Sequence, residues 1–260
     1  VDAGNTQTVV GLYEVDGDSS AGRRPEDGLL NHWRISTAAE RTSDEMAVLL
    51  QGFLALRGLE FGDIAGIAVS SGVPRITAAI RDLADQYLDF EPIVIEPGVK
   101  TGIRIDYDNP KEVGADRIAN AIAAFDLYGG PTVIADFGTA TTCDAISVAG
   151  EYLGGAIAPG IEISMDALVG KAAALRAVEL RAPRGVLGKS TVESIQSGAV
   201  YGFAAQVDGL VARIEDELGS CTVISTGGLA SLISPFSERI EHVEPWLTLH
   251  GLRLVHEKNS

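Results

Sequence analysis

Two stretches of this sequence share one pattern of residues that could bind a phosphate. Asp2-Ala3-Gly4-Asn5-Thr6-Gln7-Thr8 lies at the start of the chain, and Asp136-Phe137-Gly138-Thr139-Ala140-Thr141-Thr142 opens its second half. In each stretch an aspartate precedes a glycine by two residues, and small hydroxyl or amide side chains follow. Glycine at a turn lets a phosphate approach backbone N–H groups, and the aspartate can hold a hydrated cation. The pattern therefore predicts two phosphate-gripping hairpins.

The repetition of this pattern is more informative than either copy. A single Asp-x-Gly carries little weight, because aspartate and glycine are ordinary turn residues. Here strand-like apolar residues flank both copies, with Val9 and Val10 after the first and Val133 and Ile134 before the second. A chain of 260 residues with 46% hydrophobic content suits one large domain or two of roughly 130 residues. The repeat favours two domains.

A third candidate for chemistry is Gly114-Ala115-Asp116-Arg117, at the start of an otherwise apolar predicted helix. In one interpretation this is an ordinary first turn, where Asp116 complements the helix dipole and Arg117 is solvated. In the other, the two residues are a base and an anion clamp. Phosphoryl transfer needs held phosphates, offset charge and a carboxylate that accepts the proton of the attacking hydroxyl. Periodicity alone does not decide between the two.

Other glycine-rich segments carry weaker signals. Residues 185–190 end like a P-loop, but Pro183 stands where the first glycine is required and no strand is predicted before it, so we reject that interpretation. Gly154-Gly155, Pro159-Gly160 and Gly227-Gly228 could be turns or sites where a ligand approaches the backbone. Composition alone favours turns.

Charge and composition exclude several classes of function. Lys and Arg number 20 against 36 Asp and Glu, and this formal charge of −16 argues against a broad nucleic-acid or anionic-membrane surface. Cys143 and Cys221 are far apart and the four histidines share no ligand spacing, so neither a disulfide framework nor a zinc site is predicted. Without a membrane-length apolar run or a signal-peptide pattern, we expect a cytoplasmic protein. We also expect a first strand ending at Asp2 to need residues ahead of Val1.

The periodicity predicts two similar halves, 1–112 and 113–260. In the first, strands are expected before and after a polar stretch at 16–28, with Ser43 as a helix cap and Pro74 in a first helical turn. The predicted elements of the first half are strands at 7–14, 29–35, 64–69 and 93–95 and helices at 44–56 and 74–88. Those of the second half are helices at 113–127, 161–173 and 191–218, strands at 132–136, 141–148, 152–158 and 222–225, and a terminal helix or strand pair. This order predicts an α/β protein of two ribonuclease H-like domains, with a nucleotide cleft between them.

Taken in order, the motifs resemble those of type III pantothenate kinase. The matching segments are Asp2–Thr6, Tyr107–Pro110 with Glu112–Arg117, Asp136–Ala140, Gly154-Gly155 with Pro159-Gly160, and Gly188–Thr191. The resemblance runs nearly end to end. It implies the fold of the acetate and sugar kinase, Hsp70 and actin superfamily. It also implies ATP-dependent phosphorylation of pantothenate to 4′-phosphopantothenate, the first step of coenzyme A biosynthesis, with Mg²⁺ carried by the nucleotide.

The same resemblance implies a role for each matching residue. ATP would be bound by Asp2, Ala3, Gly4, Asn5, Thr6, Gln7, Thr8, Val9 and Thr139. Pantothenate would be bound by Tyr107, Gly114, Ala115, Asp116, Arg117 and Thr191. Asp116 would be the proton acceptor, and Asp136 would coordinate a monovalent metal-site cation, K⁺ or NH₄⁺. The family is typically a homodimer with the acceptor site near the subunit interface.

Some residues depart from the family pattern, and two rival functions stay open. The stretch 16–28 lengthens the first hairpin, Gln7 replaces the usual Asn, and Arg176 stands where Pro is common. One rival is a related kinase acting on a sugar, a carboxylic acid or another small hydroxyl substrate, and pantetheine is a further acceptor to consider. The other is a catalytically silent paralogue that senses a metabolite, although such a protein could lose Asp116 or Asp136 and this chain keeps both.

Overall fold

The computed structural model describes residues 1–14, 24–171 and 177–260, and they form two compact units. The first unit is Val1–Leu127 together with Trp246–Ser260, and the second is Tyr128–Pro245. The predicted boundary at 112/113 falls inside the first unit. Most of the polar stretch 16–28 and the departure at Arg176 lie outside the described residues. In the described part of the chain, no helix is long and apolar enough to cross a membrane.

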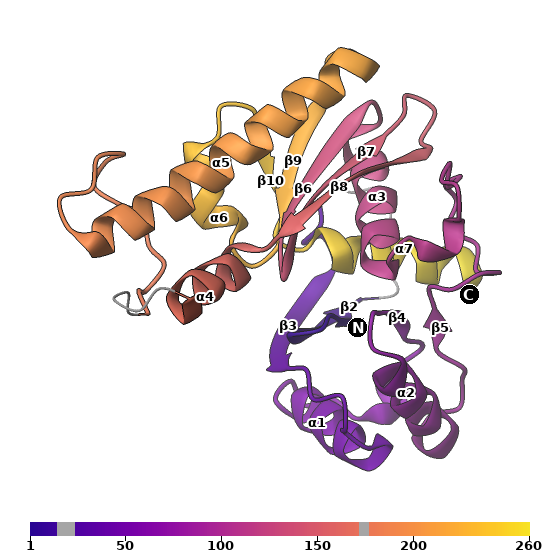
Figure 1. The fold of residues 1–260 in the computed structure, drawn as a ribbon. Helices are drawn as coiled ribbons and strands as arrows, with labels where there is room; N and C mark the ends of the chain where they lie inside the picture. The colour runs from indigo at the N-terminus through magenta and orange to yellow at the C-terminus, as the bar shows by residue number, and fades with distance from the viewer. Residues whose placement is uncertain (15–23, 172–176) are drawn as a thin grey trace. The chain divides into compact units, whose positions relative to one another are not determined.

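The first unit is built on a five-stranded sheet (Figure 1). Its strands are β1 (Asp2–Ala3), β2 (Gln7–Tyr13), β3 (Leu29–Ser36), β4 (Ala68–Ser71) and β5 (Ile93–Val94). They lie in the order β3-β2-β1-β4-β5, with β1, β2 and β3 antiparallel and β4 and β5 parallel to β1. Two helices, α1 (Ser43–Ala55) and α2 (Pro74–Tyr87), contribute Met46, Ile76 and Ile80 to a core shared with Ala3 and Val69 of the sheet.

The second unit repeats this sheet. Its strands are β6 (Thr132–Phe137), β7 (Ala140–Ile146), β8 (Tyr152–Pro159), β9 (Thr222–Thr226) and β10 (His242–Val243). They lie in the order β10-β9-β6-β7-β8, and again the first three are antiparallel while the last two run parallel to the first. Counted from its own first strand, each sheet therefore has the same strand order and directions. This confirms the predicted duplicated ribonuclease H-like fold.

Helices of the second unit cover one face of its sheet. They are α4 (Ile161–Lys171), α5 (Thr191–Leu218) and the short α6 (Ala230–Ile233). α5, orange in Figure 1, contributes Val200 and Val207 to a core with Val133, Phe137 and Cys143 of the strands. This packing attaches the middle of the long helix to the sheet, whereas Thr191 lies in its first turn.

Two further helices, α3 (Ala115–Tyr128) and α7 (Leu247–Asn259), pack together in the first unit. Gly251 lies so close to α3 that a Cβ there would come within 2.0 Å of the Ala119 carbonyl oxygen. Thr248 Oγ1 donates a hydrogen bond to Asn120 Oδ1 at 2.7 Å. The last helix of the chain is therefore an integral part of the unit that contains the first strand.

The sequence located most elements to within two or three residues, and the structure corrects two details. Thr42, not Ser43, caps α1, because its hydroxyl accepts from Glu45 N while its own amide donates to the Glu45 carboxylate. The predicted strand at 64–69 is observed as β4 at Ala68–Ser71. It begins late because its ladder partners lie opposite these four residues, with Ala68 and Val69 pairing to β5.

Candidate active site

The first predicted hairpin joins β1 to β2. Gly4 N donates to Gln7 O at 3.0 Å, so Asn5 and Thr6 form an exposed tip. Thr37, just beyond β3, holds this tip from behind. Its amide donates to Thr6 O at 3.0 Å and its hydroxyl to Gly4 O at 2.7 Å. Sequence reasoning missed Thr37, although a threonine directly after a strand is a recognisable hydrogen-bonding residue.

Asp2 is held beside the same hairpin. The hydroxyl of Ser70, the β4 residue paired with Asp2, donates a hydrogen bond to Asp2 Oδ1. The pKa of Asp2 is raised from 3.8 to about 6, mainly by burial and to a lesser extent by the negative charge of Asp116, while the Ser70 hydrogen bond opposes the rise. A carboxylate that is costly to ionise alone gains from a nearby cation. Ser70 was not predicted, and its only signal is a serine directly after the apolar residues Ala68 and Val69.

Asp116 lies exposed in the first turn of α3. Its Oδ1 accepts the Arg117 amide at 2.8 Å, and it lies 2.5 Å from where a Cβ of Gly114 would stand. Gly114 therefore leaves room for this carboxylate. Arg117 is only 9% exposed, which is inconsistent with the interpretation that it is a solvated residue of an ordinary first turn. Tyr107 is 37% exposed and lies in the connection that leads from β5 to α3.

The second predicted hairpin joins β6 to β7. Gly138 N donates to Ala140 O at 3.1 Å, which leaves Thr139 exposed at the tip. Gly160, directly after β8, donates its amide to Thr139 O at 3.1 Å. A Cβ on Gly160 would lie 2.2 Å from that same oxygen. The Pro159-Gly160 pair is therefore a site of close backbone approach that supports the hairpin tip, rather than a plain turn.

Asp136, at the end of β6, is packed between two glycines. A Cβ on Gly138 would lie 3.3 Å from Asp136 Oδ1, and one on Gly227 would lie 2.4 Å from it. Gly227 also has a φ of 93°, in the left-handed region that disfavours other residues. Composition favoured a turn at Gly227, and the structure adds a second requirement, because a Cβ there would also lie 2.7 Å from the carbonyl carbon and oxygen of Phe137, which are backbone atoms.

Thr191 is the first residue of α5 and is exposed. Ser190 caps the helix, with its hydroxyl accepting from Glu193 N at 3.2 Å. The described residues 177–190 contain no strand, which agrees with the rejection of a P-loop.

The predicted site residues are thus divided between the two units. The first unit contains Asp2 to Val9, Tyr107 and Gly114 to Arg117, and the second contains Asp136, Thr139 and Thr191. Within the first unit, Asp2 and Asp116 are near enough for their charges to interact. No group of three or more His, Cys, Asp or Glu side chains in the described residues could hold a metal ion.

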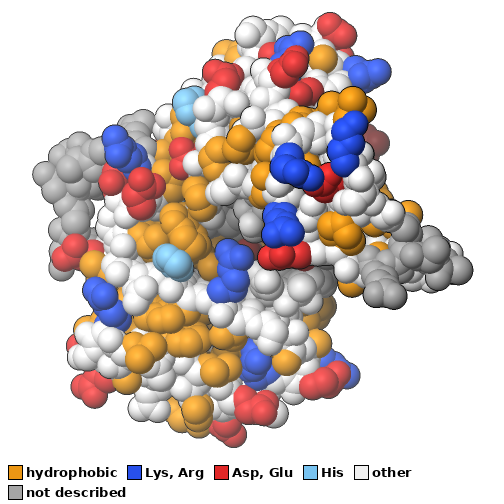
Figure 2. All heavy atoms as spheres, turned by 90° about the vertical axis from the view of Figure 1, so that its left-hand side faces the viewer, with side chains coloured by type: hydrophobic (Ala, Val, Ile, Leu, Met, Phe, Trp, Pro, Cys, Tyr) orange, Lys and Arg blue, Asp and Glu red, His pale blue; other side chains and the backbone are white. Residues whose placement is uncertain are grey.

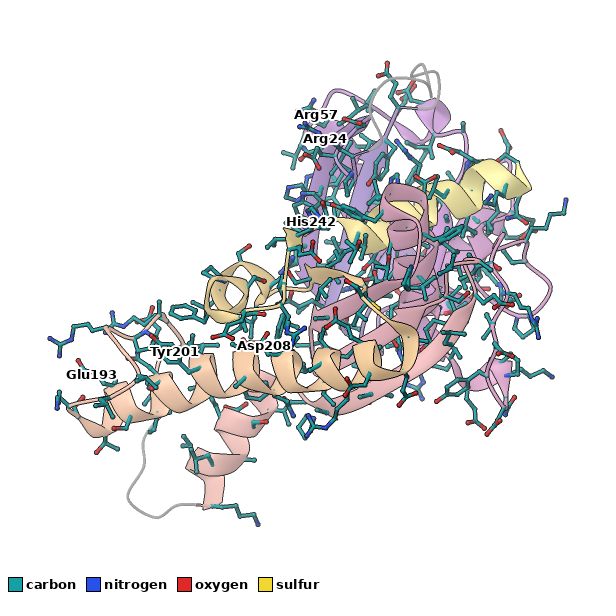
Figure 3. All side chains as sticks on the ribbon, turned by 90° about the horizontal axis from the view of Figure 1, so that it is seen from above. Arg24, Arg57, Glu193, Tyr201, Asp208 and His242 are labelled. Atoms are coloured by element: carbon teal, nitrogen blue, oxygen red, sulfur yellow. The ribbon has the colours of Figure 1, made fainter. Side chains whose placement is uncertain are left out.

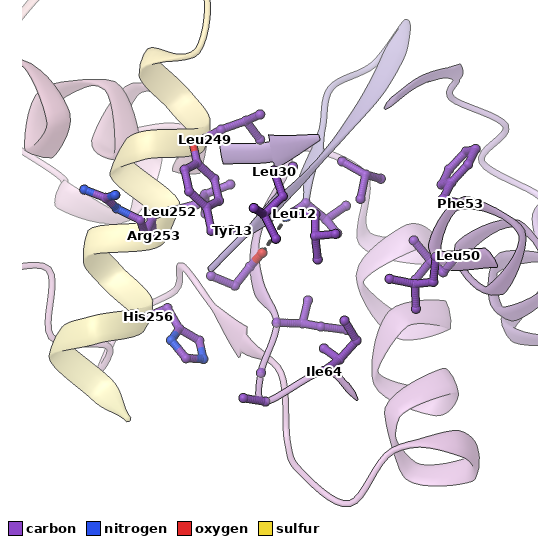
Figure 4. Close-up of a pocket in the computed structure, with 18 of the residues that line it drawn as sticks. Leu12, Tyr13, Leu30, Leu50, Phe53, Ile64, Leu249, Leu252, Arg253 and His256 are labelled. Carbon is purple, nitrogen blue, oxygen red and sulfur yellow. Dashed lines mark hydrogen bonds between the residues drawn. The ribbon is translucent and has the colours of Figure 1, made fainter. Parts of the chain in front are cut away.

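A cavity of about 690 Å³ in the first unit is not part of this constellation (Figure 4). Its wall is largely apolar and includes Leu12, Phe53 and Leu249. The cavity lies beside the parts of β2 and β4 that extend beyond β1, which has only two residues. None of the predicted ATP-binding or pantothenate-binding residues lines it.

Comparison with known proteins identifies the family. A sequence profile described as type III pantothenate kinase matches residues 1–213. A type III pantothenate kinase of Streptomyces griseus is 55% identical over 268 residues, covering 100% of this chain and 97% of that protein. The chain belongs to the type III pantothenate kinase family. Another type III pantothenate kinase, from Thermobifida fusca, is 49% identical over 265 residues, covering 100% of this chain and 98% of the relative.

Solved structures show how widely the fold of this type III pantothenate kinase family member is shared. A protein assigned as a 2-dehydro-3-deoxygalactonokinase, from Sinorhizobium meliloti, superposes with a TM-score of 0.58. The match covers 98% of this chain and 94% of that one at 14% sequence identity. At this identity the likeness concerns the fold alone, so the substrate must be argued from the site.

Proposed function

We propose that this protein transfers the γ-phosphoryl group of ATP to pantothenate, forming 4′-phosphopantothenate for coenzyme A biosynthesis. The observation that carries the proposal is the carboxylate of Asp116, exposed at the start of α3 in the space that Gly114 leaves open. Membership of the type III pantothenate kinase family supports the choice of acceptor.

Asp116 is proposed as the general base. Its Oδ1 is oriented by the Arg117 amide at 2.8 Å, and the carboxylate is exposed and so accessible to an acceptor hydroxyl. Arg117 is proposed to serve the pantothenate carboxylate, with Tyr107, Gly114, Ala115 and Thr191 completing the acceptor site. Because phosphoryl transfer depends mainly on positioning and charge, one well-placed carboxylate that accepts the proton of the acceptor hydroxyl is sufficient.

The two hairpins are proposed to hold the nucleotide. Residues Asp2 to Val9 offer the exposed tip at Asn5 and Thr6, and Thr139 offers the equivalent tip of the second hairpin. Asp2, with its raised pKa, would pair with the Mg²⁺ of the nucleotide, which supplies charge neutralisation when bound. Asp136 is proposed to hold K⁺ or NH₄⁺.

The location and the assembly are also proposals. Cys143 and Cys221 are buried free thiols, which suits a reducing cytoplasm. A homodimer is supported by exposed apolar side chains of the second unit, on α4, before α5 and in its first turn. These are Ile163, Leu168, Val186, Leu187 and Val192. Figure 2 views the side of the molecule that is on the left in Figure 1, and hydrophobic side chains lie between the charged ones there.

The dimer has a direct test in sedimentation velocity. Leu187, 78% exposed, should be part of the interface, so Leu187→Glu should yield monomers where the unaltered protein is a dimer. Val148 is 71% exposed and lies in the β7–β8 connection, so Val148→Glu is the matched control. A dimer that persists in Leu187→Glu would contradict this choice of surface.

A coupled assay of ADP release tests the proposed reaction. Purified protein with ATP, Mg²⁺ and K⁺ should phosphorylate pantothenate, and a panel of pantoyl amides including pantetheine tests the acceptor. Asp116→Asn should lower turnover by roughly 10²–10⁴, as expected for a lost general base, with the circular dichroism spectrum unchanged. Full turnover in this variant would remove Asp116 from the mechanism. Turnover of sugars or carboxylic acids instead of pantothenate would favour a related kinase, and no turnover with any acceptor would favour a silent paralogue.

A further inference from the structure

The segment before α5 has no regular structure of its own, yet side chains of α5 fasten it at several points. Residues 177–190 form neither helix nor strand in the described chain. Such a segment is ordered only if its backbone groups find partners elsewhere. The partners here come from the first two turns of α5, the part of the helix that begins with Thr191.

Glu193 makes the largest share of these contacts. Its Oε2 accepts the Lys189 amide at 2.8 Å, and its Oε1 accepts Arg184 Nε at 2.8 Å. One carboxylate therefore joins two points of the segment that are five residues apart. The Lys189 amide and then Arg184 lower the pKa of Glu193, so the carboxylate is ionised when it makes these bonds. Figure 3 shows Glu193 at the starting end of α5, with Tyr201 and Asp208 further along the helix.

Two neighbours on the same helical face strengthen the attachment. Gln196 Nε2 donates to Glu179 O at 2.9 Å, and Ser197 Oγ donates to Val186 O at 2.5 Å. Both side chains are buried, so these bonds are shielded from competing water. Residues three and four apart share a helix face, and the three side chains therefore grip one side of the segment.

Gly188 brings the segment into direct contact with the helix backbone. A Cβ at this position would lie 2.5 Å from Ser194 N and 2.7 Å from the Glu193 carbonyl carbon. The segment thus rests on the helix at Gly188, is bonded at Lys189 and caps the helix at Ser190. These three residues immediately precede Thr191.

We propose that Glu193 is a positioning residue, which holds segment 184–190 against α5 and thereby sets the place of Thr191 for the acceptor. This role rests on the proposed function, in which Thr191 binds pantothenate. The bond from the Lys189 amide should matter more than the Arg184 pair, because Arg184 is 83% exposed and exposed ion pairs contribute little.

The test separates acceptor positioning from general folding by measuring both substrates. Glu193→Ala should raise the KM for pantothenate about tenfold, as for the loss of one charge-assisted hydrogen bond, and leave the KM for ATP within about twofold. Arg184→Ala should change either KM by less than about threefold. Glu217→Ala, an exposed glutamate at the far end of the same helix, is the matched control and should match the unaltered protein.

Amide hydrogen exchange supplies a readout that does not depend on activity. In Glu193→Ala, the peptide covering 184–192 should exchange about tenfold faster, while the peptide covering 206–218 should not change. Faster exchange with an unchanged KM for pantothenate would show that the attachment exists but does not position the acceptor, and would overturn the proposal. Unchanged exchange would overturn it as well. If the unaltered protein fails to phosphorylate pantothenate, the proposed function fails and this role fails with it, whereas a working enzyme with a normal Glu193→Ala KM refutes this role alone.

Discussion

Replacing Asp2 by asparagine should stabilise the first unit at neutral pH while impairing nucleotide binding. Burial raises the pKa of Asp2 to about 6 in the folded protein, from 3.8. The folded state therefore binds this proton more tightly than the unfolded chain does. The stabilisation from the protonated form is fully present below pH 3.8 and is lost as the pH rises through about 6. Asparagine mimics the protonated carboxyl and should not suffer this loss.

The size of the effect follows from the two pKa values. One pKa unit corresponds to about 1.4 kcal/mol, so the rise from 3.8 to about 6 corresponds to about 3 kcal/mol of unfolding free energy. The advantage of Asp2→Asn should be absent near pH 3, about 1.5 kcal/mol at pH 5 and about 3 kcal/mol at pH 8. With MgATP at 100 times its Kd, this advantage should nearly disappear at pH 8, because the bound ligand adds about 2.7 kcal/mol to the unaltered protein and not to the variant that binds it poorly.

Urea unfolding followed by tryptophan fluorescence is a suitable assay. Trp33 and Trp246, the two tryptophans of the chain, both belong to the first unit, so the signal reports on the unit that contains Asp2. Asp85→Asn, on the exposed side of α2, is the matched control. If Asp2→Asn changed the unfolding free energy by the same amount at pH 5 and pH 8, the charge on Asp2 would not be the cause and the reasoning would fail.

Three further predictions concern Asp2 and Asp136 and the groups around them. Ser70→Ala removes the hydroxyl that favours ionised Asp2, so it should raise the pKa of Asp2 and lower stability more at pH 8 than at pH 5, measured by the same urea titrations. Gly227→Ala should lower the free energy of unfolding by about 2–4 kcal/mol, because alanine is strained at a φ of 93° and its Cβ would lie 2.4 Å from Asp136 Oδ1. Differential scanning calorimetry measures this loss, and a value below about 1 kcal/mol would contradict the prediction. Replacing K⁺ by Na⁺ should lower turnover in the unaltered protein and have little further effect in Asp136→Asn, and an equal response of both proteins would exclude Asp136 as the cation site.

The fold was accessible from the sequence because its signals are local and repeated. Apolar periodicity located α5 at Thr191–Leu218, and Pro74 marked the first turn of α2. The return of α7 to the first unit left no such trace. It depends on the close approach of Gly251 to Ala119, residues more than a hundred positions apart, which neither periodicity nor propensity encodes. The first and last residues of a strand such as β4 likewise depend on which neighbouring strands lie opposite it.

The candidate site was predictable where a residue carries its own motif. Asp2, Asp116 and Asp136 stand beside glycines in recognisable patterns, and the structure adds the reason for those glycines. Supporting residues such as Thr37 and Ser70 were missed, because each acts through a contact with a distant segment and has an ordinary residue type.

The docking of α7 against α3 also bears on how the protein is made. The first unit requires Trp246–Ser260, which are translated after the whole second unit. A nascent chain that already exposes Asp2 and its hairpin must therefore wait through the synthesis of the whole second unit before its own core can close, while the second unit has all its residues earlier. A premature stop codon just before Trp246 would leave the second unit with all its residues and the first unit without its last helix.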